Sequence, residues 1–407
     1  MSKLSEMIAR LCPNGVEYKK LGEVLKSIRT GLNPRNNFRL NEPTANNFYV
    51  TVKEISSGKL AFSDKTDRVT DEALKIIQRR SCLEYGDVLL SGIGTIGKVA
   101  IVEIPTNNFN CSESVYLLKP NFELIMTKYL GYVLETKEIQ NQWSKTSVGS
   151  TLKGIRKETL ENVTIPLPPL PVQREIVQIL DNFANLTAEL TAELAKRKKQ
   201  YEHYRDMLLN FTGGGRYDKF GVESGEFRVE WKRLGEIAEI GTGSSNTDEQ
   251  LDEGKYPFFV RSQDVRWKNE YEYDETAIIT SGDGVGVGKI FHYHEGKYAL
   301  HQRAYRVHVF VDQVLPKYIF YYMKNGFLSY IQKNAFQSSV TSIRKPMLLN
   351  FPIPLPPLAE QERIVAILDR FDSLCNSLTE GLPAEIALRK KQYEYYRDKL
   401  LSFKEAS

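Results

Sequence analysis

The chain has 407 residues, which is long enough for two to four domains that each bury a core of their own. Hydrophobic residues make up 41% of it and charged residues 26%, and no apolar run approaches the roughly 20 residues that a membrane-spanning helix needs, which argues against a membrane protein. The net charge of +4 permits nucleic acid as a partner but does not require it.

Four cysteines are spread along the chain and form no Cys-x-x-Cys pair: Cys12, Cys82, Cys111 and Cys375. This spacing argues against a disulfide framework and against a zinc site, and it indicates a reducing compartment. The N-terminal segment is typical of a short amphipathic helix closed by Pro13 and Gly15, without the apolar region of a secretory signal. We therefore expect a cytoplasmic protein.

Two variable segments show the same order of predicted elements. In the first, about residues 25–160, strands are predicted at 48–52, 87–90, 99–102 and 114–118, followed by a helix over 127–143. In the second, strands are predicted at 258–260, 277–279 and 304–310, followed by a helix over 316–334. Because the segments share this order but little sequence, they are typical of two versions of one recognition domain.

Three sequence blocks, which we call the repeated frame, flank and follow these segments in two copies each. The blocks are VEYKKLGEV at 16–24 and VEWKRLGEI at 229–237, IPLPPLPVQREIVQILDNF at 165–183 and IPLPPLAEQERIVAILDRF at 353–371, and RKKQYEHYRDMLLNF at 197–211 and RKKQYEYYRDKLLSF at 389–403. The period is far too long for a solenoid, so it indicates the duplication of a half-molecule.

The prolines of the second block predict an extended, stiff entry into a long helix. No proline or glycine interrupts 172–211, where apolar residues recur at spacings of three and four as in a coiled-coil seam. In the second copy Gly381 and Pro383 interrupt the pattern, so we expect two helical pieces there. The two stripes are expected to bury each other, antiparallel if a pseudo-twofold axis relates the halves. The seam and partner-docking candidates are Leu180, Phe183, Leu190, Leu194, Tyr204, Leu368, Phe371 and Tyr396.

A small tandem repeat, Thr-Ala-Glu-Leu, lies within the first long helix at 187–194. Each unit adds about 6 Å of helix, so a change in their number would move whatever lies at the two ends. A filler with no metrical role is the alternative. Three glycines at 213–215 then predict a flexible hinge into the second half.

The expected fold is α+β: two α/β recognition domains joined by two long antiparallel coiled-coil spacer helices, with a pseudo-twofold internal repeat. The predicted domains are a first recognition domain at 1–165, a central spacer helix at 166–212, a second recognition domain at 213–352 and a C-terminal spacer helix at 353–407.

No motif predicts an active site. Residues 92–98, GIGTIGK, match part of a phosphate-binding loop, but Val99 stands where a magnesium-holding Ser or Thr belongs, and the matching stretch near Lys289 does not keep the spacing. A glycine-rich turn that presents a lysine to a phosphate backbone fits both copies better than nucleotide binding does. His292, His294 and His301 cluster without Cys or carboxylate at ligand spacing, so no metal site is expected.

Basic residues interleaved with aromatic and amide residues are frequent in both variable segments, and such side chains can contact phosphates and base edges. A solvated surface is the alternative for each of them singly. The DNA-binding candidates are Arg29, Arg35, Arg79, Arg80, Lys98, Lys153, Arg156, Arg261, Arg266, Lys289, Arg303 and Arg344, and the same basic set includes Arg39, Lys145, Lys268 and Arg306.

The duplicated IPLPPL and RKKQYE blocks, the glycine–lysine turns and the Thr-Ala-Glu-Leu repeat together resemble the specificity subunit of type I restriction–modification enzymes, in its type IC branch. The resemblance covers essentially the whole chain. It implies two target recognition domains that each read one half of a split double-stranded DNA sequence, and assembly with two methyltransferase subunits and with motor-nuclease subunits. It also implies that the chain is not an enzyme and binds no cofactor itself, since S-adenosylmethionine, ATP and magnesium would bind to the partners. A nucleotide-binding protein and a coiled-coil scaffold without DNA readout are the alternatives.

Overall fold

A computed structural model describes residues 3–56, 58–146, 154–211, 229–333, 342–377 and 379–406. The chain divides into two compact units, one of Met1–Leu190 with Ile386–Ser407 and one of Thr191–Glu385. Lys153, the side chain of Lys145 and the predicted hinge at 213–215 lie outside the described residues.

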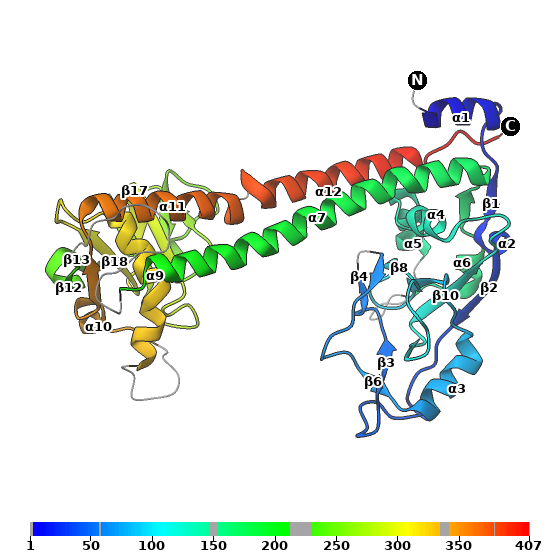
Figure 1. The fold of residues 1–407 in the computed structure, drawn as a ribbon, viewed down its shortest axis with the longest axis horizontal. Coiled ribbons are helices and arrows are strands. Elements are labelled where there is room, and N and C mark those ends of the chain that lie inside the picture. Colours follow the sequence, from blue (N-terminus) through cyan, green and yellow to red (C-terminus); the bar gives the residue numbers. More distant parts are fainter. Residues whose placement is uncertain are drawn as a thin grey trace. The chain divides into compact units, whose positions relative to one another are not determined.

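The first unit is built on a four-stranded antiparallel sheet in the order β2-β10-β7-β8 (Figure 1). Its strands are β2 (Leu25–Thr30), β10 (Val115–Pro120), β7 (Val88–Ser91) and β8 (Val99–Ile101). A second sheet has the order β6-β3-β9, from β6 (Arg68–Val69), β3 (Asn47–Val50) and β9 (Phe109–Cys111). The remaining strands form the pairs β4 (Ile55–Ser56) with β5 (Lys59–Leu60) and β1 (Tyr18–Lys20) with β11 (Thr164–Pro166). The predicted strands of this segment are confirmed.

Seven helices of the described residues lie in the first unit or begin there. They are α1 (Lys3–Leu11), α2 (Leu21–Val24), α3 (Asp71–Ser81), α4 (Thr127–Leu134), α5 (Lys137–Thr146), α6 (Lys157–Glu161) and the 39-residue α7 (Leu170–Leu208), which continues into the second unit. The single helix predicted over 127–143 is therefore wrong, because it breaks after α4. The hydroxyl of Thr136 donates to the carbonyl of Val133 (2.8 Å), a local bond that competes with continued helix.

The second unit repeats this plan with one larger sheet, in the order β13-β18-β16-β17-β14-β15. Its strands are β13 (Ala238–Thr242), β18 (Ala304–Val309), β16 (Tyr273–Ser281), β17 (Phe291–Leu300), β14 (Tyr256–Phe259) and β15 (Arg266–Lys268), beside the separate pair β12 (Glu230–Arg233) and β19 (Pro352–Leu355). Its helices are α8 (Leu234–Ile237), the 3-10 turn η1 (Thr247–Glu249), α9 (Pro316–Lys333), α10 (Lys345–Leu349), α11 (Leu358–Asn376) and the start of α12 (Gly381–Leu400). The predicted break near Gly381 is confirmed.

The prolines of the repeated frame serve one purpose in both units. They place β11 and β19 in two-stranded ribbons, where the missing N–H groups of Pro166 and Pro354 leave no central ladder incomplete. The partners are β1 and β12, which belong to the VEYKK and VEWKR blocks. Two blocks of the frame that lie far apart in the sequence are thus paired, and the sequence pattern alone does not reveal this pairing.

One glycine in each unit is required by the unit's own backbone. A Cβ on Gly31 would lie 1.6 Å from the carbonyl oxygen of Cys111, and a Cβ on Gly243 would lie 1.8 Å from that of Leu300. Neither glycine has a positive φ. The absence of a side chain at both positions is therefore explained by close backbone contact rather than by a positive φ.

Candidate nucleic-acid interface

A buried glutamine fixes each sheet unit to its long helix. The Nε2 of Gln173 in α7 donates to the carbonyls of Leu124 (2.9 Å) and Pro168 (2.8 Å), and its Oε1 accepts from the N–H of Met126 (2.9 Å). The side chain is fully buried, so these three bonds satisfy it where water cannot reach. Gln361 in α11 repeats the pattern with Gln313 O (3.1 Å), Pro356 O (2.9 Å) and Leu315 N (2.9 Å).

An aspartate about two turns further along each helix provides a second anchor. Asp181 in α7 accepts hydrogen bonds from Lys128 Nζ (2.9 Å) and from the hydroxyl of Tyr132, both in α4. Burial, together with this carboxylate, raises the pKa of Tyr132 well above its ordinary value, so the phenol stays a donor. Asp369 in α11 repeats the anchor with Lys317 (3.0 Å) and Tyr321 of α9. The repeated frame therefore holds the two variable domains in the same way.

Three arginines of the first unit, Arg29, Arg79 and Arg80, lie at α3. This helix was not predicted, although Thr70 followed by Asp71 and Glu72 is a helix-start signal. Arg79 and Arg80 are exposed in its last turn. Arg29 of β2 donates to the carbonyl of Arg80 (3.3 Å) and to Cys82 Sγ (3.1 Å), so its charge lies at the C-terminal end of the helix dipole.

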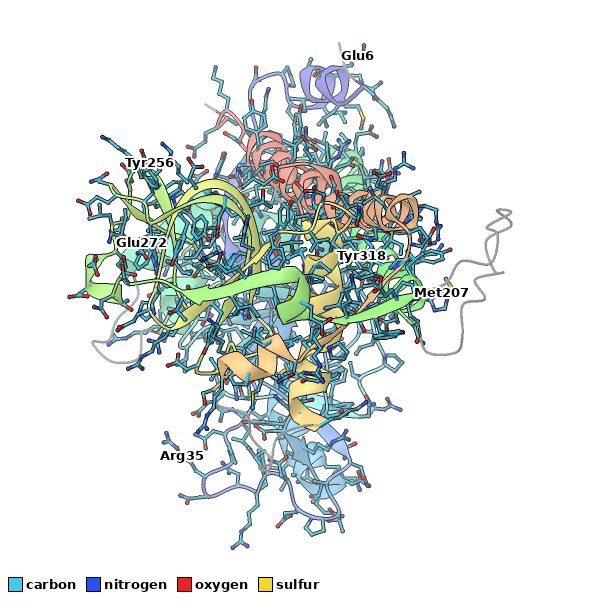
Figure 2. All side chains as sticks on the ribbon, turned by 90° about the vertical axis from the view of Figure 1, so that its left-hand side faces the viewer. Glu6, Arg35, Met207, Tyr256, Glu272 and Tyr318 are labelled. Carbon is cyan, nitrogen blue, oxygen red and sulfur yellow. The ribbon has the colours of Figure 1, made fainter. Side chains whose placement is uncertain are left out.

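Arg35 belongs to the loop that packs on the same helix. Leu32, Phe38 and Leu40 of this loop contact the buried cluster around Ile77 of α3. Arg35 itself is exposed and lies at the end of the first unit opposite Glu6 of α1 (Figure 2). The loop and α3 thus form one basic end of the first unit.

The glycine-rich turn of the first unit is a hairpin tip between β7 and β8. The N–H of Lys98 donates to Ser91 Oγ (2.8 Å), and its Nζ donates to the carbonyl of Val52 (3.2 Å). Antiparallel β8 follows at once, whereas a phosphate-binding loop opens a helix there. This geometry contradicts the nucleotide-binding alternative. Arg156 lies exposed at the start of α6.

The basic residues of the second unit meet at the equivalent hairpin, between β16 and β17. Asp283 accepts hydrogen bonds from Arg261 Nη1 (2.8 Å) and Arg303 Nη1 (3.2 Å). Partial burial raises the pKa of Asp283, but the two arginines outweigh it and leave that pKa below its ordinary value. Lys289 at the base of the hairpin and Arg344 at the start of α10 are both exposed.

Three other basic candidates have different environments. Arg306 is buried, its Nη1 lies 3.0 Å from Glu275, and its Nη2 pairs with Glu239. Its charge therefore belongs to a structural ion pair within the unit, and it is not the DNA contact that the basic set suggested. Lys268 pairs with Glu249 (2.5 Å) and with Ser245, and it too is bound within the unit. Arg266 is half-buried in β15.

The histidine cluster has structural partners. The ring of His292 contacts the carbonyl of Ser262 (3.1 Å), that of His294 contacts the carbonyl of Lys297 (3.2 Å), and Nδ1 of His301 accepts from a backbone N–H (3.0 Å). Burial lowers the pKa of His292 below its ordinary value. Over the part of the chain that the structure describes, no group of three His, Cys, Asp or Glu residues is placed to hold a metal ion.

Several of the seam candidates pack between helices within each unit. In the first, α12 runs antiparallel to α7 (Figure 1), Leu180 is buried, and Phe183 stacks on Tyr396 with ring centroids 5.4 Å apart. In the second, Leu368 is buried, and the rings of Phe371 and Tyr204 are in contact with their centroids 5.5 Å apart. Leu190 and Leu194, in the tandem repeat, are only half-buried.

Polar surface in the second unit is not all basic. The loop after β13 carries Asp248, Glu249, Asp252 and Glu253, whereas the corresponding loop of the first unit carries Arg35 and Arg39. Met207 lies near the end of α7, and Tyr256 and Glu272 lie on the opposite side of this unit (Figure 2). The two units therefore share a frame but present different charges.

No helix among the described residues is both long enough and apolar enough to cross a membrane. Solved structures with the same fold include the crystal structure of a type I restriction–modification S subunit from M. genitalium (TM-score 0.55, 16% identity, 95% of this chain and 96% of that one). A chain from a study of complex assembly and conformational transition in a type I R-M system also matches (TM-score 0.60, 21% identity, 96% and 98%). At these identities the likeness concerns the fold alone.

The sequence is similar to that of the Escherichia coli type I restriction enzyme EcoR124I/EcoR124II specificity subunit, with 39% identity over 60% of this chain and 63% of that one. It is also similar to the putative specificity subunit S.HindORF215P of Haemophilus influenzae, with 35% identity over 61% and 66%. The chain thus spans slightly less than two thirds of these two relatives. The type I restriction modification DNA specificity domain matches residues 13–197 and again 228–388, so the chain belongs to that family and carries its domain twice.

Proposed function

We propose that the chain is the DNA-recognition subunit of a type I restriction–modification complex, in which residues 1–165 and 213–352 each read one half of a bipartite DNA site. The observation that carries the proposal is the contrast within the repeat. The anchors Gln173 and Asp181 recur as Gln361 and Asp369, while the exposed basic residues differ between the two domains. A frame kept constant around surfaces that vary suits two readers of different half-sites.

Sequence reading by such a surface combines phosphate contacts, which set register, with contacts to base edges in the major groove. In the first domain Arg35, Arg79 and Arg80 are exposed and suited to both. In the second, Arg261 and Arg303 keep exposed guanidinium groups while Asp283 fixes their direction. A carboxylate that orients an arginine reduces the freedom the arginine loses on binding.

The spacer helices, 166–212 and 353–407, would set the gap between the half-sites and hold two methyltransferase subunits, with motor-nuclease subunits joining the assembly. Adenine methylation and DNA cleavage would then take place on the partners, which would bind S-adenosylmethionine, ATP and magnesium, in the cytoplasm. This chain would contribute recognition and no catalytic group. A helix of 39 residues is about 58 Å long, a length of between one and two turns of DNA.

The test is co-expression with a candidate methyltransferase subunit, followed by mapping of methylated adenines across the host genome. The proposal expects one bipartite motif, with two specified parts separated by a fixed unspecified gap. A scaffold without DNA readout would give no motif and no salt-dependent binding of the assembled complex to DNA. Either result would contradict the proposal.

A further inference from the structure

The hairpin between β16 and β17 ends in an apolar side chain that no described residue covers. Val285 is 97% exposed, more than any other large hydrophobic residue that the structure describes. Gly284 precedes it with a φ of +80°, and a Cβ there would meet no atom within 4 Å. The chain thus carries Val285 on an open turn where the described residues of its unit leave it exposed.

The base of this hairpin is fixed, so the tip has a defined position. Ser281 Oγ donates to the carbonyl of Asp283 (2.8 Å), and the carbonyl of Gly282 accepts from the N–H of Ile343 (2.7 Å). On the other side of the tip, a Cβ on Gly286 would lie 2.3 Å from Ile290 Cδ1, so the backbone there is closely packed. A valine held outward by an ordered turn suits contact with a partner.

The charge around the tip indicates the kind of partner. Arg261 and Arg303 flank the turn through Asp283, with 40% and 61% of their side chains exposed. Arg344 comes directly after Ser342 and Ile343, which pair with the hairpin, and Lys289 lies at the base of the hairpin. With these four cationic side chains and the one carboxylate of Asp283, the surface around the tip is positively charged and favours a polyanionic partner. An apolar point within a basic rim matches the major groove of DNA, where phosphates flank an apolar group, the 5-methyl of thymine.

The first unit offers a natural comparison. Its hairpin between β7 and β8 carries Thr95 in the turn, and Ser91 Oγ donates to the Thr95 carbonyl (2.6 Å). Threonine has nearly the shape of valine but carries, in place of one methyl, a hydroxyl that can hydrogen-bond to a base edge. The two hairpins therefore present side chains of one shape and different polarity to whatever they contact.

We propose that Val285 is a specificity-determining residue that contacts the 5-methyl group of a thymine in the half-site read by the second domain. The inference rests on the proposed function and adds to it one residue and one base group. Its Ala variant removes the contact without a cavity, since the side chain lies in solvent. Loss of one buried methyl contact should weaken binding by about fourfold.

The experiment is a double-mutant cycle on the assembled complex of this chain with its methyltransferase partner. Binding is measured for wild type and V285A on duplexes that carry the mapped site, with each thymine of the second half-site replaced in turn by deoxyuridine, which lacks only the methyl. At one thymine, the base change and V285A should each cost about fourfold, and the two together should cost no more than either alone. V285T keeps the methyl and should bind nearly as the wild type does.

A T95A variant is the matched control, since it alters the corresponding turn and should leave every second-half deoxyuridine effect unchanged. The inference is overturned if the losses of DNA affinity multiply at every thymine, or if the half-site holds no thymine. It is also overturned if V285A weakens subunit assembly in the absence of DNA, because that result would assign the tip to a protein partner. A wild-type complex with no methylation motif overturns the proposed function as well, and the two failures are thereby distinguished.

Discussion

Replacement of Gln173 by leucine tests the frame on which both recognition domains rest. Leucine has a similar volume but neither donates nor accepts, so Q173L would leave the carbonyls of Leu124 and Pro168 and the N–H of Met126 buried without their partner. Each buried group left unsatisfied costs about 1–3 kcal/mol. Three such groups, with partial relaxation, give a local loss of about 3–6 kcal/mol.

The loss should be local, because these bonds join the loop before α4 to the start of α7. Hydrogen–deuterium exchange of peptides that cover 121–135 measures it directly, and a loss of about 3 kcal/mol should speed exchange there roughly 100-fold. Q178L is the matched control, since Gln178 lies in the same helix but is exposed, and its substitution should change stability by no more than about 0.5 kcal/mol.

The reasoning also predicts where nothing should change. Peptides of the second unit, including those around Gln361, should exchange at the wild-type rate in Q173L. Equal exchange in Q173L and Q178L would show that the glutamine bonds do not anchor the domain, and a chain-wide increase would show that the two units do not unfold separately.

Two further predictions concern the long helix and the half-buried His292. Insertion of one more Thr-Ala-Glu-Leu unit after Leu194 lengthens α7 by about 6 Å and should lengthen the unspecified gap in the methylated motif with both half-sites unchanged, whereas an unchanged gap would contradict a spacing role. Burial lowers the pKa of His292, so the stability that its neutral ring contributes is present above its ordinary pKa of 6.5 and is lost as the pH falls below it. H292Q should therefore flatten the decline in melting temperature below that pH without abolishing it, because the pKa of His301 is lowered in the same direction. A decline as steep as that of the wild type would contradict this assignment.

Periodicity and repetition predicted the parts of the fold whose signals are local. The strands that were predicted, a helix over most of 316–334 and the long seam helices follow from alternation and from apolar stripes, and they were found where expected, whereas strands such as β2 and β17 were not predicted. The break at Thr136 escaped prediction because it depends on a side-chain hydrogen bond that competes with the helix. The ribbons that join β1 to β11 and β12 to β19 escaped it because two-residue alternation does not specify a distant partner.

The candidate interface was predicted as a set of basic residues, not as an arrangement. Composition does not distinguish Arg306 from Arg303. Arg306 is paired with Glu275 and Glu239 from two other strands, whereas Arg303 remains largely exposed. Nor did it single out Val285, since an apolar residue between glycines reads as an ordinary turn until its exposure is known. Three-dimensional pairing decides which charges stay available to a partner.

The most direct test of bipartite reading is exchange of residues 25–160 for the corresponding segment of another family member, with the second domain and the frame left intact. Methylated adenines are then mapped for both chains in complex with the same methyltransferase. The account predicts that one half of the motif changes while the other half and the gap stay the same. A change in both halves, or in neither, would contradict independent reading by two domains.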